Sequence, residues 1–309
     1  MNVIRSVKSW FDTAEHQQDP SGPVRVDLSR VLSFVFLHVG FLGLIWVGWS
    51  PFAVGFAIAS YFARMFFITG FYHRYFSHRT FDTSRPMQFL FAVAGNTAVQ
   101  RGALWWAAQH RHHHAHSDEP EDPHSPVAHG LYWSHMGWLT SQSNFRTRHE
   151  LIPDLAKYPE LRWLDRFDTA VPALYAVGTF LLGFLLNRFV PALGVDGPQM
   201  LVWGFFISTA ALLHATCLVN SAAHWWGSRP YKTTDQSRNN LWVALVTLGE
   251  GWHNNHHHYP ASARQGFRWW EIDVTYYMLK AMGAIGLIRK LRPVPAHALT
   301  RGRNVHSET

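Results

Sequence analysis

The chain has 309 residues, a net charge of +7 and one cysteine, Cys217, and 48% of its residues are hydrophobic. A single cysteine excludes an internal disulfide and any metal site built from cysteines, so a metal would need histidine ligands. The basic charge does not indicate nucleic-acid binding, because no basic run is interleaved with aromatic residues and most arginines flank apolar segments. A membrane surface is the better partner for this charge.

Residues 1–30 carry charged side chains throughout and no apolar core, so we expect no cleavable signal and a cytosolic N-terminal segment. Residues 31–49 are almost entirely apolar, and their number matches the ~20 residues that span a bilayer as a helix. After a Ser-Pro turn, residues 52–71 form a second apolar run, so the two runs predict a transmembrane hairpin.

The second apolar run contains one charged residue, Arg64. Charges inside a membrane are costly, and they often face a cavity or a partner that serves function. Arg64 also lies near the cytosolic end of the run, where a long side chain can extend to the interface. The sequence leaves both interpretations open.

Residues 170–186 and 200–219 predict a second hairpin, with a turn that contains Pro and Gly between them. Four spans return both termini to the same side of the membrane. The arginines outside the spans gather on that side, so the positive-inside rule predicts that the termini and the histidine-rich segments are cytosolic.

Three further stretches predict helices that do not cross the membrane. Residues 87–108 are interrupted by polar side chains and residues 241–248 are too short, so both predict interfacial or buried cap helices. Near the C-terminus, Trp269, Trp270 and other aromatic residues precede several Lys and Arg residues. This pattern is typical of an amphipathic helix that lies on the cytosolic face of the membrane.

The 21 histidines gather in clusters beside the expected spans. His73 and His78 stand five residues apart where the second apolar run ends. In an α-helix of ~3.6 residues per turn, this gap turns the two side chains away from each other. The pair would therefore reach one metal from different sides or from a frayed helix end.

Two other clusters share a spacing that places three imidazoles on one helical face, at positions i, i+3 and i+4. They are His110, His113 and His114 in the first, and His253, His256 and His257 in the second. Two such faces opposed to each other could enclose two metals. Asn220 and His224 follow at i and i+4 at the end of the last span, where they could complete the site.

The type of ligand does not identify the metal, because imidazole suits iron, zinc, copper and nickel. The setting narrows the chemistry. Nine imidazoles at a membrane surface, without the carboxylates of soluble di-iron bundles, would hold two redox metals beside hydrocarbon, where oxidation of an aliphatic chain is the natural use. Glu250 and Asn254 could orient ligand imidazoles or cap a helix, and the sequence does not separate these roles.

The chain resembles the membrane fatty-acid desaturase family, and within it the stearoyl-CoA and bacterial delta-9 branch, over residues 31–293. The resemblance rests on four motifs that occur in the family's order: HRYFSH from His73, HRHHH from His110, VNSAAH ending at His224, and GEGWHNNHH from Gly249. It implies an all-α integral membrane protein with four transmembrane helices in two hairpins, a cytosolic helical cap and a C-terminal tail over residues 294–309.

The resemblance also implies a di-iron centre and the residues that bind it. One iron would be bound by His73, His78, His114 and His257, with Asn220 holding a water on it. The other would be bound by His110, His113, His224, His253 and His256. No catalytic residue beyond these ligands is expected. The implied reaction uses O2 to introduce a cis double bond, at the delta-9 position, into a saturated acyl chain.

The implied partners are membrane lipids, an acyl substrate and a separate electron donor of the ferredoxin, rubredoxin or cytochrome b5 type with its reductase. Ala108-Gln109 replaces an Arg-Asp pair with which the animal branch contacts coenzyme A. Acyl-CoA, acyl-carrier and lipid-linked substrates therefore all stay open. The segment around Asp122 and Trp133 resembles the bacterial pattern, which implies a bacterial inner membrane.

Met65, Trp105 and Trp106 are candidate substrate-tunnel residues. Met65 lies ~12 Å before His73 along a helix and could limit chain length, although packing against lipid also explains it. Both tryptophans could line the substrate path, but tryptophan is common at membrane interfaces in any case.

Two alternatives to a desaturase remain open from the sequence. A fatty-acyl hydroxylase or acetylenase would use the same metals and begin with the same removal of hydrogen, so only its product would distinguish it. A membrane metal carrier or sensor would place its histidines along a path inside the spans, whereas here they gather outside the spans on one side.

Overall fold

The computed structural model describes residues 11–13, 26–300 and 302. Most of the predicted N-terminal segment 1–30 and the end of the predicted tail 294–309 therefore lie outside the described residues. The α-helices used below are α2 (Leu28–Val39), α3 (Leu44–Val47), α4 (Pro51–Phe66), α5 (Arg85–Asn96), α6 (Ala103–His116), α7 (Pro126–His129), α8 (Leu131–His135), α9 (Pro153–Ala156), α10 (Pro159–Arg166), α11 (Ala170–Phe189), α12 (Gly197–Leu201), α13 (Ser208–Ser221), α14 (Leu241–Val246), α15 (His253–His258), α16 (Val274–Ala284) and α17 (Ala296–Thr300).

Helices of other types and one small sheet complete the regular structure. Two are π-helices, η3 (Phe67–Ser77) and η8 (Val202–Ile207). The 3-10 helices are η2 (Gly40–Gly43), η4 (Gly137–Thr140), η5 (Gln142–Asn144), η6 (His149–Leu151), η7 (Pro191–Leu193) and η9 (Ala222–His224). Strands β1 (Asp82–Thr83) and β2 (Ile288–Arg289) pair antiparallel, with Asp82 opposite Arg289. The mostly helical class is therefore confirmed.

Three helical segments in the described chain are long and apolar enough to cross a membrane: Pro51–Ser77, Ala170–Phe189 and Gly197–His224. They extend the predicted spans 52–71, 170–186 and 200–219 at one or both ends. The chain is a multi-pass membrane protein. A fourth span at 31–49, the first in chain order, is not shown: the apolar helical segment among the described residues there is Val31–Val47.

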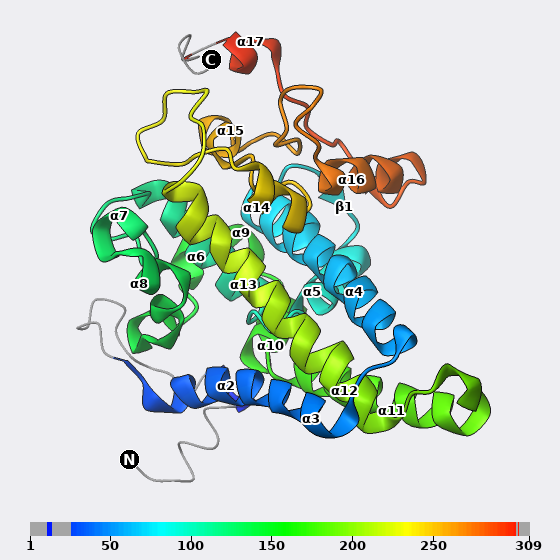
Figure 1. Ribbon diagram of the computed structural model, residues 1–309. Helices are drawn as coiled ribbons and strands as arrows, with labels where there is room; N and C mark the ends of the chain where they lie inside the picture. The colour runs from blue at the N-terminus through cyan, green and yellow to red at the C-terminus, as the bar shows by residue number, and fades with distance from the viewer. Residues whose placement is uncertain (1–10, 14–25, 301, 303–309) are drawn as a thin grey trace.

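The helical segment at this position is irregular, because the 3-10 turn η2 divides it. From Leu28 to Val47 the elements α2, η2 and α3 follow one another, a length of about 30 Å at ~1.5 Å per residue, so a fourth span stays a prediction. A Cβ atom at Gly40 would lie 2.1 Å from the ring of Phe206, and one at Gly43 would lie 2.6 Å from Val202. These glycines let α2 and α3 press against η8, and Figure 1 shows the pair running across one end of the molecule.

Arg64 is buried inside the bundle and does not extend to the interface. Only 2% of it is exposed. Its guanidinium donates to the carbonyl oxygen of Thr97 and to the hydroxyls of Thr209 and Ser208, at 3.2, 2.7 and 2.5 Å. The ring of Tyr175 lies 4.7 Å away. One arginine therefore connects α4 with α13, with α11 and with the turn after α5.

The non-spanning stretches fold into a cap of short helices. Residues 87–108 form not one helix but parts of two, α5 and α6, because the turn between them holds Val99 and Arg101 in the left-handed region, at φ 62° and 67°. The main apolar core joins α4, η3, α5, α6 and α10. This core fixes α6, which carries a histidine cluster, against η3, which carries another.

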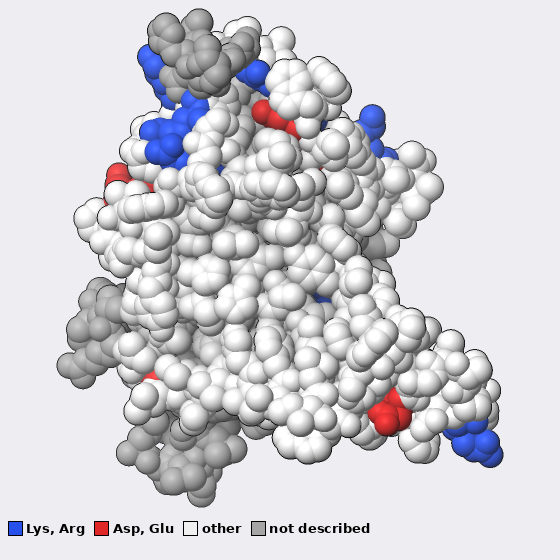
Figure 2. All heavy atoms as spheres, in the orientation of Figure 1, with Lys and Arg blue, Asp and Glu red and all other residues white. Residues whose placement is uncertain are grey.

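The predicted surface helix near the C-terminus is present as α16. Thr275 and Leu279 are buried, whereas Tyr277, Met278 and the preceding Trp269 and Trp270 are exposed. On the face drawn in Figure 2, Lys and Arg gather mainly at the end that carries α15 to α17, while the broad band over α4 and α13 is almost free of charge. Contact of α16 with a membrane stays a prediction.

Candidate metal centre

The histidines of the four motifs come together in one buried centre, although they belong to elements far apart in the chain. They form two groups in which the ring nitrogens lie within 4.8 Å of one another. We call them cluster A, which is His73, His78, His110, His114 and His256, and cluster B, which is His113, His224, His253 and His257. All nine predicted histidine ligands belong to one of the two clusters.

A π-helix explains how His73 and His78 reach the same cluster. The segment η3 is wound with hydrogen bonds between residues five apart, and the N–H of His78 donates to the carbonyl oxygen of His73 at 3.2 Å. The two rings then lie 4.9 Å apart, centroid to centroid. The expectation that a gap of five would turn them apart assumed α-helical geometry, and it is wrong for this reason.

Helices α6 and α15 each supply histidines to both clusters. Residues four apart on an α-helix are turned by only ~40°, so such pairs stay together, while the residue at i+3 leans to the other side. Accordingly His110 and His114 belong to cluster A and His113 to cluster B, while His253 and His257 belong to cluster B.

This division differs from the one that the family resemblance implies. His110 and His256, expected together with His113, lie in cluster A, and His257, expected with His73, lies in cluster B. The clusters are neighbours, however, because the rings of His114 and His257 stack at 4.4 Å.

The arrangement of ring nitrogens suits metal ions. Within cluster A, Nε2 of His114 lies 3.0 Å from Nε2 of His110 and 2.9 Å from Nε2 of His256. In cluster B the Nε2 atoms of His224 and His253 are 2.9 Å apart. Two nitrogens bound to one metal at ~2.0–2.1 Å would lie roughly 3 Å apart, so these distances match a shared ion.

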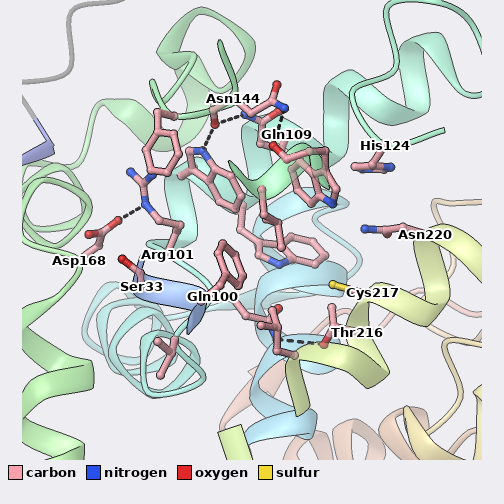
Figure 3. A pocket seen from close by; sticks show the side chains of 18 of the residues that line it. Ser33, Gln100, Arg101, Gln109, His124, Asn144, Asp168, Thr216, Cys217 and Asn220 are labelled. Carbon is pink, nitrogen blue, oxygen red and sulfur yellow. Dashed lines mark hydrogen bonds and ion pairs between the residues drawn. The ribbon is translucent and has the colours of Figure 1, made fainter. Parts of the chain in front are cut away.

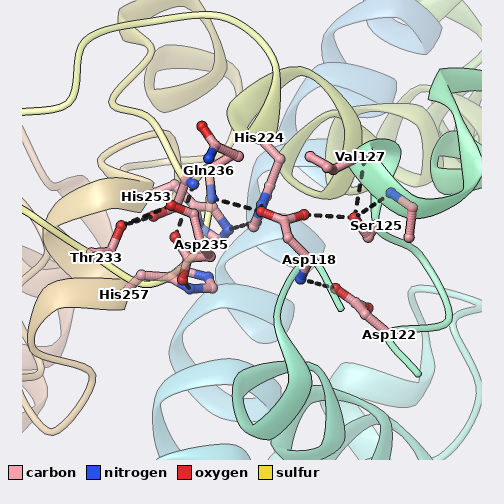
Figure 4. Close-up of polar contacts among 12 residues, drawn as sticks. Asp118, Asp122, Ser125, Val127, His224, Thr233, Asp235, Gln236, His253 and His257 are labelled. Atoms are coloured by element: carbon pink, nitrogen blue, oxygen red, sulfur yellow. Dashed lines mark hydrogen bonds and ion pairs between the residues drawn. The ribbon is translucent and has the colours of Figure 1, made fainter. Parts of the chain in front are cut away.

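Carboxylates on the far side of the rings fix which nitrogen faces the cluster. In cluster B, Nδ1 of His224 and His257 donates to Asp118 and Asp235, at 3.0 and 2.6 Å (Figure 4). Nδ1 of His113 donates to Asp122 at 2.8 Å. A neutral imidazole that donates from Nδ1 presents an unprotonated Nε2. Lone pairs on several Nε2 atoms then point at one another, an arrangement that a bound cation stabilises.

In cluster A the corresponding carboxylate is Glu250. Its side chain accepts from Nδ1 of His73 at 2.5 Å, from Arg74 at 3.1 Å and from Gln265 at 2.9 Å. Arg74 also donates to Asp273 at 2.9 Å. Glu250 thus orients a ligand imidazole, one of its two predicted roles. Asn254 does not orient a ligand, because its side chain bonds the backbone of Tyr231.

Burial keeps four of the histidines in the neutral form that binds metal. Burial lowers the pKa of His110, His114, His253 and His256 well below the usual range, so these rings are neutral. Burial alone would raise the pKa of Asp122, but His113 and His124 outweigh it and hold this pKa below its ordinary value. Neutral imidazoles beside ionised carboxylates are the protonation states of a histidine metal site.

A large cavity of about 240 Å³ adjoins the metal centre. Its lining is mostly apolar, with Trp105 and Trp106 on α6 and Leu213 on α13. In Figure 3, Arg101 and Asp168 lie at one end and His124 and Asn220 at the other. His110 of cluster A and Asn220 belong to this lining, so a molecule in the cavity reaches the metal centre.

Met65 does not line the large cavity. It lines a smaller one of about 40 Å³, together with His73 and His110 of cluster A and His113 and His253 of cluster B. Asn220 and Trp106 border both cavities. The structure therefore brings the two predicted tryptophans together at one cavity and places Met65 at the other.

The sequence analysis did not identify three aspartates that accept hydrogen bonds from histidines of this site: Asp118, Asp122 and Asp235. Asp118 and Asp122 follow α6 within a few residues, in the acidic segment 118–122 that could have drawn attention. Asp235 lies in a loop 22 residues before its partner His257, and no local signal marks it.

Comparison with known proteins agrees with this geometry. A fatty acid desaturase family model matches residues 47–287. The chain is 37% identical over 286 residues to a probable chloroplastic lipid desaturase of Arabidopsis thaliana, covering 90% of this chain and 73% of the relative. It is 36% identical over 236 residues to an sn-2 palmitoyl-lipid 9-desaturase of a Nostoc species, covering 75% and 78%. It is also 36% identical over 247 residues to an acyl-CoA C20 Δ5-desaturase of Anemone leveillei, covering 79% and 74%.

Proposed function

We propose that this chain, which belongs to the fatty acid desaturase family, uses O2 to introduce a cis double bond at the delta-9 position of a saturated acyl chain. The observation that carries the proposal is the junction of clusters A and B with a mostly apolar cavity through His110 and Asn220. A site that oxidises an unactivated methylene needs both parts, a redox metal pair and a dry space for hydrocarbon.

The metal ligands in this proposal are the nine histidines of clusters A and B, with Asn220 as a further ligand through a water. Two irons bound there would supply activation of O2. The chain itself supplies orientation: Asp118, Asp122, Asp235 and Glu250 hold four of the rings, and burial keeps water away from them.

The acyl chain would lie in the large cavity against Trp105 and Trp106. The indole of Trp105 donates to the carbonyl oxygen of Asn144 at 2.7 Å, and the ring of Trp106 lies 5.0 Å from that of His110. Gln100 donates to Thr216 at 3.0 Å across the cavity wall. These contacts support a rigid wall that can hold one pair of methylenes near cluster A.

The substrate that carries the acyl chain is proposed to be a membrane lipid. Two observations support this. The Arg-Asp pair expected for coenzyme A is replaced by Ala108 and Gln109, of which Gln109 is engaged with the backbone of Asn144. Relatives named as acyl-lipid desaturases match this chain, although one named as an acyl-CoA desaturase matches it about equally. A separate ferredoxin, rubredoxin or cytochrome b5 would deliver electrons on the cytosolic side of a bacterial inner membrane.

The test is the fatty-acid profile of a host that expresses this chain, beside a His113→Ala, His256→Ala double variant that is matched for membrane insertion. Gas chromatography with location of the double bond should show a new delta-9 monounsaturated chain only with the intact histidines. A hydroxylated or acetylenic product would assign the chain to the alternative chemistry on the same metals. An unchanged profile from iron-loaded protein would contradict the proposal.

The carrier is tested with purified protein, an electron donor and one palmitoyl chain presented as a phospholipid or galactolipid, as acyl-CoA or as acyl-carrier protein. Turnover of the lipid alone is the expected result. Turnover of a thioester alone would contradict the lipid assignment and would leave the desaturase assignment intact.

A further inference from the structure

The smaller cavity has the size and position of a binding site for a diatomic gas. Its volume of about 40 Å³ exceeds the ~10–15 Å³ that a cavity needs to hold one small molecule such as water, and it is a fraction of the 240 Å³ of the large cavity. His73 and His110 of cluster A line it, as do His113 and His253 of cluster B. A molecule inside it would therefore face both clusters at once.

The hydroxyl groups in this cavity are already engaged with the protein. Thr247 donates to the carbonyl oxygen of Val243 at 2.6 Å, and Thr216 donates to that of Leu212 at 3.0 Å. Thr69 bonds the hydroxyl of Thr275 at 2.7 Å. These hydroxyls are therefore already used within the protein and offer an occupant no free O–H to donate.

Apart from Glu250, Asn220 and Trp106, the remaining wall is apolar and belongs to the membrane spans. Met65 and Ile68 come from the segment Pro51–Ser77, and Val219 comes from Gly197–His224. Only 1% of Met65 and 2% of Ile68 are exposed. Because dioxygen is apolar and dissolves readily in hydrocarbon, a cavity walled by two membrane helices is suitably placed to receive it from the bilayer.

The two cavities meet at Trp106, His110, Thr216 and Asn220, which line both. An acyl chain in the large cavity would cover its own side of this shared wall. The side of the wall that faces Met65 and Val219 would stay open to both clusters. The two reactants therefore have separate compartments that meet at the metal centre.

We infer that the cavity bounded by Met65, Ile68 and Val219 is the dioxygen compartment of this protein, supplied from the membrane and distinct from the acyl cavity. The inference rests on the proposed function, since only an O2-dependent reaction needs such a compartment. Its chemical content is the binding of an apolar diatomic molecule, and no covalent step takes place within it.

Xenon is the probe that does not depend on turnover, because it enters small apolar cavities. Crystals or detergent-solubilised protein pressurised with xenon should show a site beside Val219 in the full-length chain. The site should be lost in Val219→Phe, whose ring fills the space, and weakened in Val219→Leu, which adds less volume. No xenon at this position in the parent protein would overturn the inference.

Oxygen kinetics supply the second readout. Val219→Phe should raise KM for O2 roughly tenfold, which corresponds to ~1.4 kcal/mol, and leave KM for the acyl substrate unchanged. The matched control is Leu213→Phe, on the same helix but lining only the large cavity, which should affect the acyl substrate and not O2. Equal values of KM for O2 in Val219→Phe and the parent would overturn the inference. Absence of turnover in the parent would instead contradict the proposed function, and the xenon result would still decide the inference.

Discussion

Clusters A and B contain the same kind of ligand, but the protein holds them in place in different ways. In cluster B, three histidines donate from Nδ1 to the aspartates Asp118, Asp122 and Asp235. Among the described residues of cluster A only His73 bonds a carboxylate, Glu250, while each cluster has one buried Nδ1 without a hydrogen-bond partner, that of His256 in cluster A and that of His253 in cluster B. Hydrogen bonds from aspartates in loops hold the rings of cluster B, whereas the winding and packing of helices hold those of cluster A.

The two clusters are held differently because different parts of the fold surround them. Cluster A depends on the π-helical winding of η3 and on packing of Trp106 against His110. Cluster B depends on two loops that also bind each other, because Asp118 accepts both from His224 and from the backbone N–H of Gln236, at 3.0 and 2.7 Å. The two metals would therefore respond to different mutations.

The charge around the two clusters differs as well. Three carboxylates bond rings of cluster B, whereas Glu250 beside cluster A shares its charge with Arg74. A carboxylate that accepts a hydrogen bond from a ligand imidazole makes that imidazole more basic, and its negative charge stabilises the positive charge of a metal. Cluster B should accordingly be the tighter site while its aspartates are intact.

Removal of one ligand from each cluster should have the largest effect. His257→Ala leaves cluster B with three histidines, and His78→Ala leaves cluster A with four. Desaturation should be lost in both variants. Bound iron, measured by mass spectrometry of the purified protein, should fall to about one ion per chain in His257→Ala and decrease less in His78→Ala, because four ligands remain. Loss of both ions in either variant would show that the clusters do not bind metal independently.

Arg74→Met should have the next largest effect, since it leaves Glu250 and Asp273 buried without their cation. Removal of one member of a buried ion pair costs about 3–5 kcal/mol of folding free energy. Thermal unfolding in detergent should show a large loss of stability, and iron should be lost from cluster A first. The control is Arg85→Met, whose partner Glu160 forms an exposed pair with it. Equal stability of the two variants would contradict the role of Arg74.

Asp235→Asn should have the smallest of the three effects and should be confined to cluster B. Replacing the carboxylate that orients a metal-bound histidine weakens metal affinity about 10–100-fold. Competition with a chelator should show one weakened iron and one that is unchanged. Asp82→Asn, at an exposed pair with Lys290, is the control. If both irons weaken together, the separate support of the two clusters is refuted.

Much of this molecule could be predicted from local sequence patterns. The i, i+3, i+4 spacing in α6 and α15 predicted that six histidines would gather in one place, because a helix fixes the relative direction of its side chains. Three of the four expected spans were found because a run of about 20 apolar residues has few other stable conformations.

What the sequence did not predict depends on contacts between distant segments. The close packing of η2 on η8 depends on Gly40 against Phe206, a pair that no local window contains. The π-helical winding of η3 is stabilised by its packing on α5 and α6, and no residue type announces it. The pairing of Asp235 with His257 requires a loop to fold back over the site.

Arg64 has a consequence for how the protein is made. Its guanidinium bonds Ser60 and Thr97 in the first part of the chain, but its two shortest bonds go to Ser208 and Thr209. Before the ribosome has synthesised α13 those oxygens do not yet exist, and the Arg64 guanidinium in the bilayer has only part of its hydrogen bonds. Insertion of α13 supplies the two missing acceptors. The hydrogen bonds that form then hold α4 in place in the membrane.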